Sequence, residues 1–405
     1  MICLIVAVLL LWRQPRIGAS DSGASARIAL VPASLPEPLP ADSGERPPTV
    51  NAGWNAKAAG AYLDQRAGWW MGWSKAQRDH ETFCISCHTA VPYAMARARL
   101  RGSLGEQGAS PAEQRLIENV TKRVRLWKEV APFYSDADRG EYKTVESRGT
   151  EAVLNALVLA SHDAQNGQLS EDARTAFANM WAEQEKSGER RGAWQWLRFK
   201  NEPWEADDSD FYGAALGAIA TGIAPGDYRE RPEIQSNLKL LRDYLQSKAA
   251  GEPLMNRVVL LWASAKVPGL VEPELQRAIV AEVFAKQEAD GGWNLPALAG
   301  NWSRHDNTPQ DVQSDGYATG LIVYAMEQFA PGKEPGQARW IGEDISKRVN
   351  AGRNWLASHQ DAATGYWPSA SLNKSEANHI GPETVRFMND AATAYSVMAL
   401  TNGRE

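Results

Sequence analysis

The feature that most constrains the fold is a repeat that begins at Asn55. Amphipathic segments with a charged face alternate with shorter, more apolar segments that are rich in Ala and Gly. Helices that are apolar on all sides have to be buried inside a larger assembly of helices. No alternating strand pattern of useful length interrupts the series. The chain is therefore predicted to be all-α, with six helical hairpins closed into an (α/α)6 toroid, or barrel.

The predicted helices fall into an outer and an inner set. The outer helices, which carry most of the charge, are Ala56–Gly68, Ala112–Lys128, Glu171–Lys186, Glu233–Lys248, Glu272–Lys286 and Glu343–Ser358. The inner helices are Cys87–Leu100, Gly149–His162, Asp210–Thr221, Met255–Val267, Asp315–Phe329 and Asp390–Thr401. Helix starts are indicated by prolines and by one capping serine, namely Pro111, Pro232, Pro273 and Ser170.

Three predicted outer helices end in related phrases. One runs from Gln287 through Gly291 to Trp293, and two with insertions run from Gln360 to Trp367 and from Gln184 to Trp194. This pattern resembles the Q-x-x-x-G-x-W repeat of class II terpene cyclases. The chain from Asn55 onward is thus similar to the α/α-toroid superfamily of terpenoid cyclases and protein prenyltransferases. The resemblance implies that the Gln and Trp side chains tie each outer helix to its neighbour.

A second motif, Cys84-Ile85-Ser86-Cys87-His88, is the attachment signature of c-type haem. Two thiols at this spacing can each form a thioether to the porphyrin, and the following histidine can bind the iron as proximal ligand. A zinc site would need further ligands, and Cys3 is the only other cysteine. A redox dithiol would need a βαβ context that this chain lacks. One covalent haem c on Cys84, Cys87 and His88 is predicted.

The distal ligand of that iron is expected to be Met or His, or the sixth position is open, which would allow catalysis. The candidates near the predicted loops are His305, His379, Met255, Met388 and Met71.

The loops that run from outer to inner helices should all emerge at one end of the toroid, the mouth. The haem motif lies in such a loop, within residues 69–100, so haem is expected at the mouth. Acidic residues gather at the same predicted end: Asp207, Asp208, Asp210, Asp315, Asp390 and Glu151. Capping of helix N-termini explains each acid singly. A paired-carboxylate proton site is the functional alternative, with Asp210, Asp208 and Asp315 as catalytic candidates.

The resemblance to class II cyclases bears on these acids. Those enzymes protonate their substrate with the middle acid of a D-x-D-D motif at such a helix start. Asp208-Ser209-Asp210 resembles its first three positions, which would make Asp210 the acid, but Phe211 stands where the last Asp should be.

The first 50 residues differ from the rest in composition. An apolar run over Ile2–Trp12, followed by Arg13 and Arg16, predicts an export signal or an N-terminal anchor over residues 1–20. Residues 21–50 are rich in Pro, Ala and Ser and predict a linker. Residues 51–405 form the predicted toroid. The expected location is periplasmic or exported, with a membrane tether through the N-terminus as the alternative.

These features predict an exported single-haem c-type cytochrome that transfers electrons to a redox partner protein, with the toroid as scaffold or binding cavity. The net charge of −6 gives no reason to expect a nucleic acid partner. The alternative is a haem- or acid-dependent enzyme that acts on a small apolar, terpenoid-like ligand in the cavity. Among enzymes, a haem oxidoreductase is favoured over a cyclase, because the haem motif is intact and the acid motif is broken.

Overall fold

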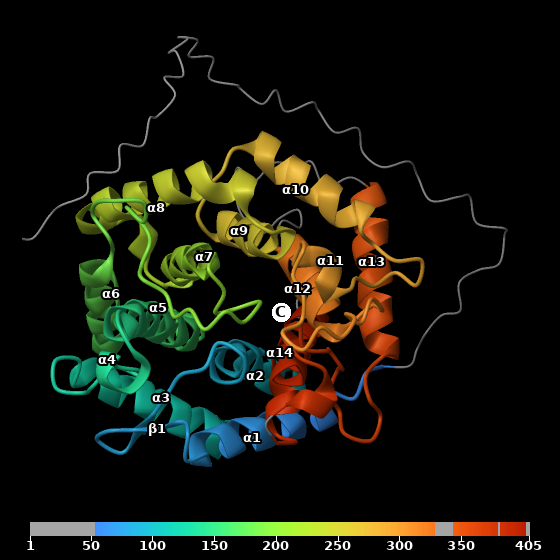
Figure 1. Cartoon of the computed structure of the whole chain (residues 1–405), viewed down its shortest axis with the longest axis horizontal. Coiled ribbons are helices and arrows are strands. Elements are labelled where there is room, and N and C mark those ends of the chain that lie inside the picture. The colour runs from blue at the N-terminus through green and yellow to red at the C-terminus, as the bar shows by residue number, and fades with distance from the viewer. Residues whose placement is uncertain (1–52, 329–342, 380, 402–405) are drawn as a thin grey trace, which may run out of the picture. The chain divides into compact units, whose positions relative to one another are not determined.

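The computed structural model describes residues 53–328, 343–379 and 381–401. Its helices form the predicted double ring (Figure 1). The outer helices are α1 (Ala56–Gly72), α3 (Pro111–Arg125), α6 (Glu171–Glu183), α8 (Gln235–Lys248), α10 (Pro273–Ala285) and α13 (Glu343–Ser358). The inner helices are α2 (Ala90–Leu104), α5 (Lys143–Ala164), α7 (Ser209–Ile223), α9 (Leu254–Lys266), α12 (Gly316–Glu327) and α14 (Phe387–Thr401). The prediction of an all-α (α/α)6 toroid is confirmed.

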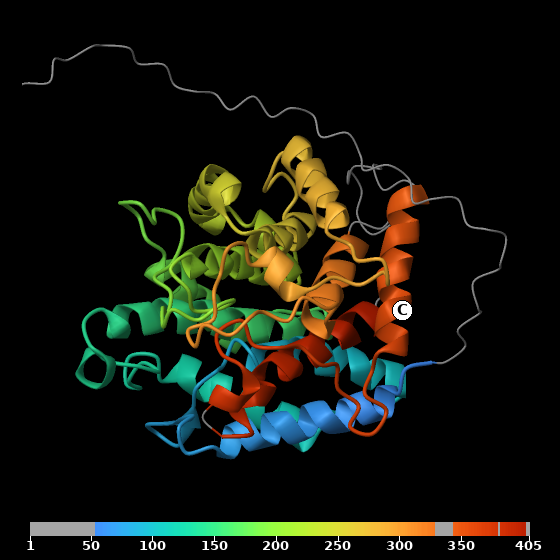
Figure 2. The ribbon, with the colours of Figure 1, turned by 45° about the vertical axis from the view of Figure 1, so that its right-hand side comes forward.

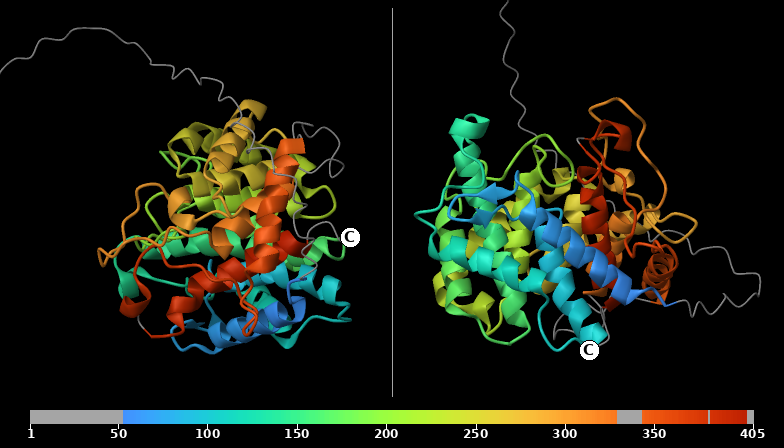
Figure 3. Two further views of the ribbon diagram at one scale, coloured as in Figure 1. Left: turned by 90° about the vertical axis from the view of Figure 1, so that its right-hand side faces the viewer. Right: turned by 90° about the horizontal axis from the view of Figure 1, so that it is seen from below.

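The inner ring is closed by packing between consecutive inner helices. Contacts run from α2 to α5, α7, α9, α12 and α14, and α14 returns to α2. Figure 2 shows the double layer obliquely, with α13 outside α12, and Figure 3 shows α1 beside α14 at the seam where the ring closes. Every inner helix therefore has two inner neighbours, which is why these segments are apolar on all sides.

The helix boundaries differ from the predicted ones where loop residues hold the chain. Helix α2 begins at Ala90, not at Cys87, because the Ser86 hydroxyl accepts hydrogen bonds from the Thr89 and Ala90 amides and shapes a turn before it. Helix α5 begins earlier than predicted, at Lys143, whose ammonium bonds the Arg198 carbonyl at 2.6 Å. Ser170 caps α6 as predicted, and Pro111 and Pro273 are the first residues of their helices.

The remaining elements are short. Helices α4 (Asp136–Arg139) and α11 (Leu295–Leu298) lie in loops, and β1 (Gln77–Arg78) pairs antiparallel with β2 (Thr82–Phe83). In the part of the chain that the structure describes, no helix is long and apolar enough to span a membrane. The predicted signal or anchor and the predicted linker lie outside the described residues.

The Gln and Trp residues of the three repeated phrases make the same contacts three times. Each Gln Nε2 donates to the carbonyl of the following glycine and to a carbonyl in, or directly before, the next outer helix. The acceptor pairs are Gly192 and Asn237 for Gln184, Gly291 and Arg348 for Gln287, and Gly365 and Asn55 for Gln360. Each Trp Nε1 donates to a carbonyl of the outer helix just completed. The role in stability that the resemblance implied is confirmed by these contacts, and the contact between Gln360 and Asn55 closes the ring.

Candidate functional site

The mouth is the end of the ring at which the six inner helices begin. Its most central segment is the loop from α6 to α7, which reaches toward the middle of the ring (Figure 1). Within that loop an antiparallel bridge joins Asn201 and Glu205. Trp204 is buried, and its indole N–H donates to the Tyr317 hydroxyl at 3.1 Å. The loop thus brings its own side chains against residues from the first and the fifth hairpins.

The Cys84–His88 segment lies at the mouth, between β2 and α2, as predicted. The Cys84 amide donates to the Ala76 carbonyl, and the Trp70 indole N–H donates to the Cys84 carbonyl at 2.7 Å. Both cysteines are free and buried. Burial raises the pKa of the Cys84 thiol to about 12 and that of Cys87 well above its ordinary value. As they stand the thiols are protonated and unreactive at neutral pH.

The His88 imidazole is partly exposed and lies among aromatic rings. It stacks on Phe387 with a centroid distance of 3.8 Å, meets Trp70 edge-on at 4.9 Å and lies 5.9 Å from the Trp204 ring. Desolvation by these neighbours lowers the pKa of His88 to about 3, so the ring is neutral at physiological pH.

The donor chemistry of the segment fits haem c. A metal ion bound directly would require its ligands to converge on one point. No cluster of three or more His, Cys, Asp or Glu side chains that could hold an ion occurs among the described residues, so Cys84, Cys87 and His88 do not form one. Haem needs no such convergence, because its thioethers form at the rim and its iron lies at the centre. Haem attachment itself stays a prediction.

The five candidates for a distal ligand are scattered. Met71 and Met388 are buried near the ends of α1 and α14, and Met255 is buried in α9, with its sulfur 4.0 Å from the Tyr317 hydroxyl. His305 is exposed and its ring lies 5.7 Å from that of Trp302, while the Nε2 atom of His379 is buried without a hydrogen-bond partner. The structure singles out none of them as the ligand.

Most of the predicted acids have structural partners. Asp315 caps α12 by accepting from the amides of Tyr317 and Ala318, and it also accepts from the Leu295 amide and the Ser369 hydroxyl. Asp210 is paired with Arg190. Two further acids form buried ion pairs, Glu151 with Arg123 and Asp390 with Arg66. Capping accounts for Asp315, and ion pairing accounts for the other three.

Asp208 differs, because it belongs to a cluster of three neighbouring carboxyls. It is half-buried at the start of α7, and its Oδ1 atom has no hydrogen-bond partner. Glu202, in the central loop, and Glu252, just before α9, lie close enough for their charges to interact with it. Burial, followed by repulsion from Asp208 and Glu252, raises the pKa of Glu202 to about 8. Burial also raises the pKa of Glu252 to about 7, and Asp208 is shifted upward for the same reason.

A single amide side chain positions Glu202. Asn373 Oδ1 accepts from the Glu202 amide at 2.9 Å and from the Trp302 indole N–H at 3.1 Å, and Asn373 Nδ2 donates to the Glu202 carbonyl at 2.5 Å. Asn373 therefore joins three loops of the mouth. Trp302 is only partly buried, so part of its indole is accessible near the Glu202 backbone.

The sequence analysis named Asp208 but missed Glu202, Glu252 and Asn373. One signal for Glu252 was present, since it precedes an inner helix as Asp208 does. Glu202 and Asn373 lie in irregular loops, and their approach depends on contacts between residues 171 positions apart.

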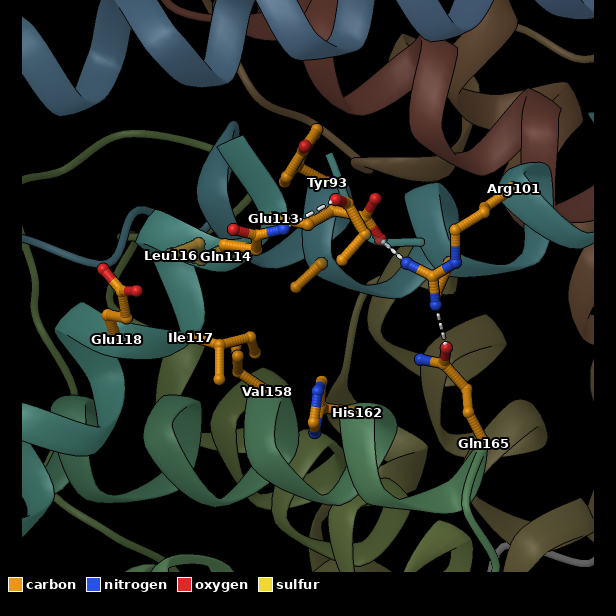
Figure 4. Close-up of a pocket in the computed structure, with 13 residues that line it drawn as sticks. Tyr93, Arg101, Glu113, Gln114, Leu116, Ile117, Glu118, Val158, His162 and Gln165 are labelled. Atoms are coloured by element: carbon orange, nitrogen blue, oxygen red, sulfur yellow. Dashed lines mark hydrogen bonds and ion pairs between the residues drawn. The ribbon is translucent and has the colours of Figure 1, made fainter. Parts of the chain in front are cut away.

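A separate cavity of about 260 Å³ lies between α2, α3 and α5 (Figure 4). Its walls include Ile117 and Val158, and on one side Arg101 donates to the Glu113 carboxylate and the Gln165 amide oxygen, both at 2.5 Å. Arg101 and Gln165 lie at the C-terminal ends of α2 and α5, so this cavity lies toward the end of the ring away from the mouth.

The chain resembles solved structures in fold. A wild-type glycosidase matches with a TM-score of 0.46 and 12% identity, over 86% of this chain and 98% of its own. An α-1,6-mannanase of Salegentibacter sp. matches with a TM-score of 0.49 and 11% identity, over 86% and 98%. A family 88 glycosyl hydrolase from Bacteroides vulgatus matches with a TM-score of 0.34 and 11% identity, over 87% and 92%. No protein-family model and no curated protein matches the sequence.

These comparisons correct the predicted function. The similar structures are named as glycosidases and not as cytochromes, so the prediction of a c-type cytochrome that transfers electrons is contradicted, and with it the alternative of an enzyme for a terpenoid-like substrate. The predicted redox partner protein and the predicted export are not tested by these comparisons and stay predictions. The label of a metal-binding cytochrome is likewise unsupported by any metal-holding cluster in the ranges that the structure covers. The α/α-toroid fold itself is given by the order and packing of the helices described above.

Proposed function

We propose that the mouth binds a hydroxyl-rich carbohydrate and cleaves a glycosidic bond by general acid–base catalysis. The observation that carries this proposal is the cluster of Glu202, Asp208 and Glu252, in which burial raises each pKa and the charge of Asp208 adds to the shifts of Glu202 and Glu252. Neighbouring carboxyls of different pKa can divide the roles of proton donor and proton acceptor at one pH.

The roles are assigned from the raised pKa of Glu202 and from the free carboxylate oxygen of Asp208. Glu202, with a pKa of about 8, is protonated at neutral pH and can donate its proton to the leaving oxygen of the glycosidic bond. Asp208 is half-buried at the start of α7 and has a free Oδ1 atom, so it is the proposed carboxylate that accepts a proton from the attacking water. The oxygen of one water bonds to the anomeric carbon as the bond from that carbon to the leaving oxygen breaks. Asp208 then releases to solvent the proton it took from the water, and Glu202 takes up a proton from solvent, which restores both carboxyls.

The unpartnered atoms of the cluster favour a substrate that donates hydrogen bonds. Asp208 Oδ1 has no donor, and neither has Oδ1 of Asn256, whose amide nitrogen binds Glu252 at 2.9 Å. Buried acceptors without donors are costly, and the hydroxyl groups of a sugar would satisfy them. The partly exposed Trp302 face would cover an apolar face of the sugar ring.

The test is an assay of new reducing ends on α-mannan, pectin and starch between pH 5 and 8. Glu202→Gln and Asp208→Asn are expected to lower kcat at least 100-fold, because Glu202 is the proposed proton donor and Asp208 the proposed proton acceptor. Glu274→Gln, on the exposed face of α10, is the matched control and should retain activity. No new reducing ends on any of the three polysaccharides, or full activity in both cluster variants, would contradict the proposal.

We propose separately that Cys84 and Cys87 attach one haem c and that His88 binds its iron; this cofactor is given no step in the acid–base reaction. The spacing of the two cysteines and the histidine, the free thiols and the neutral imidazole support it. Coexpression with a c-type maturation system should add the mass of one haem to the wild-type chain and none to a Cys84→Ala/Cys87→Ala variant. An unmodified wild-type mass would refute it. The predicted export, by signal or by tether, is tested in the same cells by fractionation.

A further inference from the structure

The proposed iron ligand is connected to the seam of the ring by a chain of hydrogen bonds. His88 Nδ1 lies 2.8 Å from the Thr89 hydroxyl oxygen, and that hydroxyl donates to Asp390 Oδ2 at 2.7 Å. Asp390 is buried in the first turn of α14. The chain His88–Thr89–Asp390 therefore links the mouth to the helix that closes the ring.

The other partners of Asp390 show that it acts only as an acceptor. Arg66 donates to both carboxylate oxygens, through Nε at 2.7 Å and Nη2 at 3.0 Å, and the Tyr62 hydroxyl donates to Oδ1 at 2.9 Å. A carboxylate that receives donors on both oxygens has no proton to give. The single hydroxyl proton of Thr89 must therefore point to Asp390.

This proton count fixes the tautomer of His88. Because the Thr89 hydrogen is committed to Asp390, the Thr89 oxygen can only accept from His88, so Nδ1 must carry the imidazole proton. Nε2 of the neutral ring then bears the free lone pair. The Phe387 and Trp70 rings hold the imidazole plane in place.

We infer that Thr89 and Asp390 are positioning residues that hold His88 as the Nδ1–H tautomer and so present Nε2 as an electron-pair donor to the iron of a haem on Cys84 and Cys87. The iron part of this inference rests on the haem proposal above; the tautomer does not. Partners of this kind orient a ligating histidine and raise its basicity. Here the orientation is also tied to Arg66 of α1, across the ring seam.

The tautomer can be measured in the full chain labelled with ¹⁵N-histidine and produced without haem. Long-range ¹H–¹⁵N correlation spectra at pH 7.5 should show His88 with a protonated Nδ1 and an unprotonated Nε2. Thr89→Val, which removes the hydroxyl, should lose that pattern, and Thr89→Ser should keep it. Thr175→Val, at an exposed site of α6, is the matched control and should leave the His88 signals unchanged. A wild-type spectrum with the proton on Nε2, or an unaltered tautomer in Thr89→Val, would overturn the inference.

The iron part has its own readout in chains matured with haem. Loss of the hydrogen bond to Nδ1 makes the imidazole a weaker donor, so Thr89→Val should shift the midpoint potential upward while Thr89→Ser and Thr175→Val stay at the wild-type value. An unchanged potential in Thr89→Val would refute the iron part and leave the tautomer result standing. If no haem is attached to the wild type, the haem proposal fails, and the spectra still decide the tautomer.

Discussion

At the scale of single residues, burial and charge repulsion decide which mouth carboxyls can exchange protons near neutral pH. Asp390 and Glu151 are equally deep in the protein, but each is paired with an arginine. Glu202 has no such partner, and its neighbours Asp208 and Glu252 are themselves acidic. A carboxyl in this situation is held in its neutral form, which is costly to ionise and useful as an acid.

The same shifts predict how stability depends on pH. Glu202 and Glu252 have raised pKa values of about 8 and about 7, and Glu205 and Asp315 are raised to about 7 and about 6. The folded protein then binds more protons than the unfolded chain above about pH 4.5. The stability that these four carboxyls contribute is therefore present below that pH and is lost as the pH rises through 8. Urea unfolding at pH 5, 6.5 and 8 should show a steady fall. Glu202→Gln should reduce this fall by a few kcal/mol, on the order of 1.4 kcal/mol per pKa unit.

Glu274→Gln, at an exposed site, should leave the slope unchanged. A wild-type stability that rises between pH 5 and 8 would contradict the assigned shifts.

At the scale of elements, the loop after each outer helix is fixed by one glutamine and one tryptophan in three of the hairpins. The glutamine side chain links the carbonyl of a loop glycine to a carbonyl in or next to the following outer helix. Glycine is required in the same loops, because Gly291 and Gly365 have positive φ angles of 91° and 84° and lie against the next outer helix.

Replacing one of these glutamines tests how much the stability of the protein depends on its two hydrogen bonds. Gln287→Ala removes the hydrogen bonds to the Gly291 and Arg348 carbonyls and should cost about 1–3 kcal/mol in the free energy of unfolding. Gln107→Ala, whose side chain makes one local contact at an exposed loop, is the control and should change stability little. Equal midpoints of urea unfolding for the two variants would argue against the role assigned to Gln287.

The close approach of inner helices to loops gives a second prediction at this scale. A Cβ at Gly149 would lie 2.2 Å from the Gln195 carbonyl oxygen, and because that atom is backbone it cannot move aside cheaply. Gly149→Ala should therefore destabilise the protein by about 1–3 kcal/mol or more. Gly68→Ala, in α1 with open space around it, should instead gain roughly 0.5–1 kcal/mol from helix propensity. Thermal unfolding should move in opposite directions for the two variants, and shifts of the same sign would contradict the packing described.

The elements could be predicted from the sequence, but the carboxyl cluster largely could not. The alternation of charged and apolar helices is a local pattern. The resemblance to the Q-x-x-x-G-x-W repeat correctly predicted that Gln287 and Trp293 link neighbouring outer helices. The cluster depends on Asn373 reaching Glu202 across the mouth, and no local pattern encodes that contact. For Asp315 the sequence left capping and catalysis open, and only its four hydrogen bonds decide for a structural role.

At the scale of the whole molecule, the seam between the first and last hairpins is held by a buried ion pair. Arg66 of α1 and Asp390 of α14 are both almost fully buried, and Arg66 also contacts Glu383. The pairing joins residues 324 positions apart, so it forms only when the ring closes. Asp390 of this ion pair is also the last acceptor in the chain of hydrogen bonds that runs from His88 through Thr89.

Breaking this pair should open the seam. Arg66→Met leaves Asp390 buried without its cation and should cost about 3–5 kcal/mol, and the double variant Arg66→Met/Asp390→Asn should recover part of that loss. Arg125→Met, which removes an exposed ion pair with Asp172, is the control and should change little. Urea unfolding compares the three variants. A loss in Arg66→Met no larger than in the control would show that the seam does not depend on this pair.

Closure also sets how such a protein can change in evolution. An open stack of helical hairpins has two end units and can lengthen or shorten by adding or losing one. In this ring Gln360 binds Asn55, so the last hairpin occupies the place that an end cap would take. Duplication of a hairpin would force every neighbouring pair to a new angle at once. Variation is therefore directed away from the number of hairpins and into the loops of the mouth, where insertions leave the angles between hairpins unchanged.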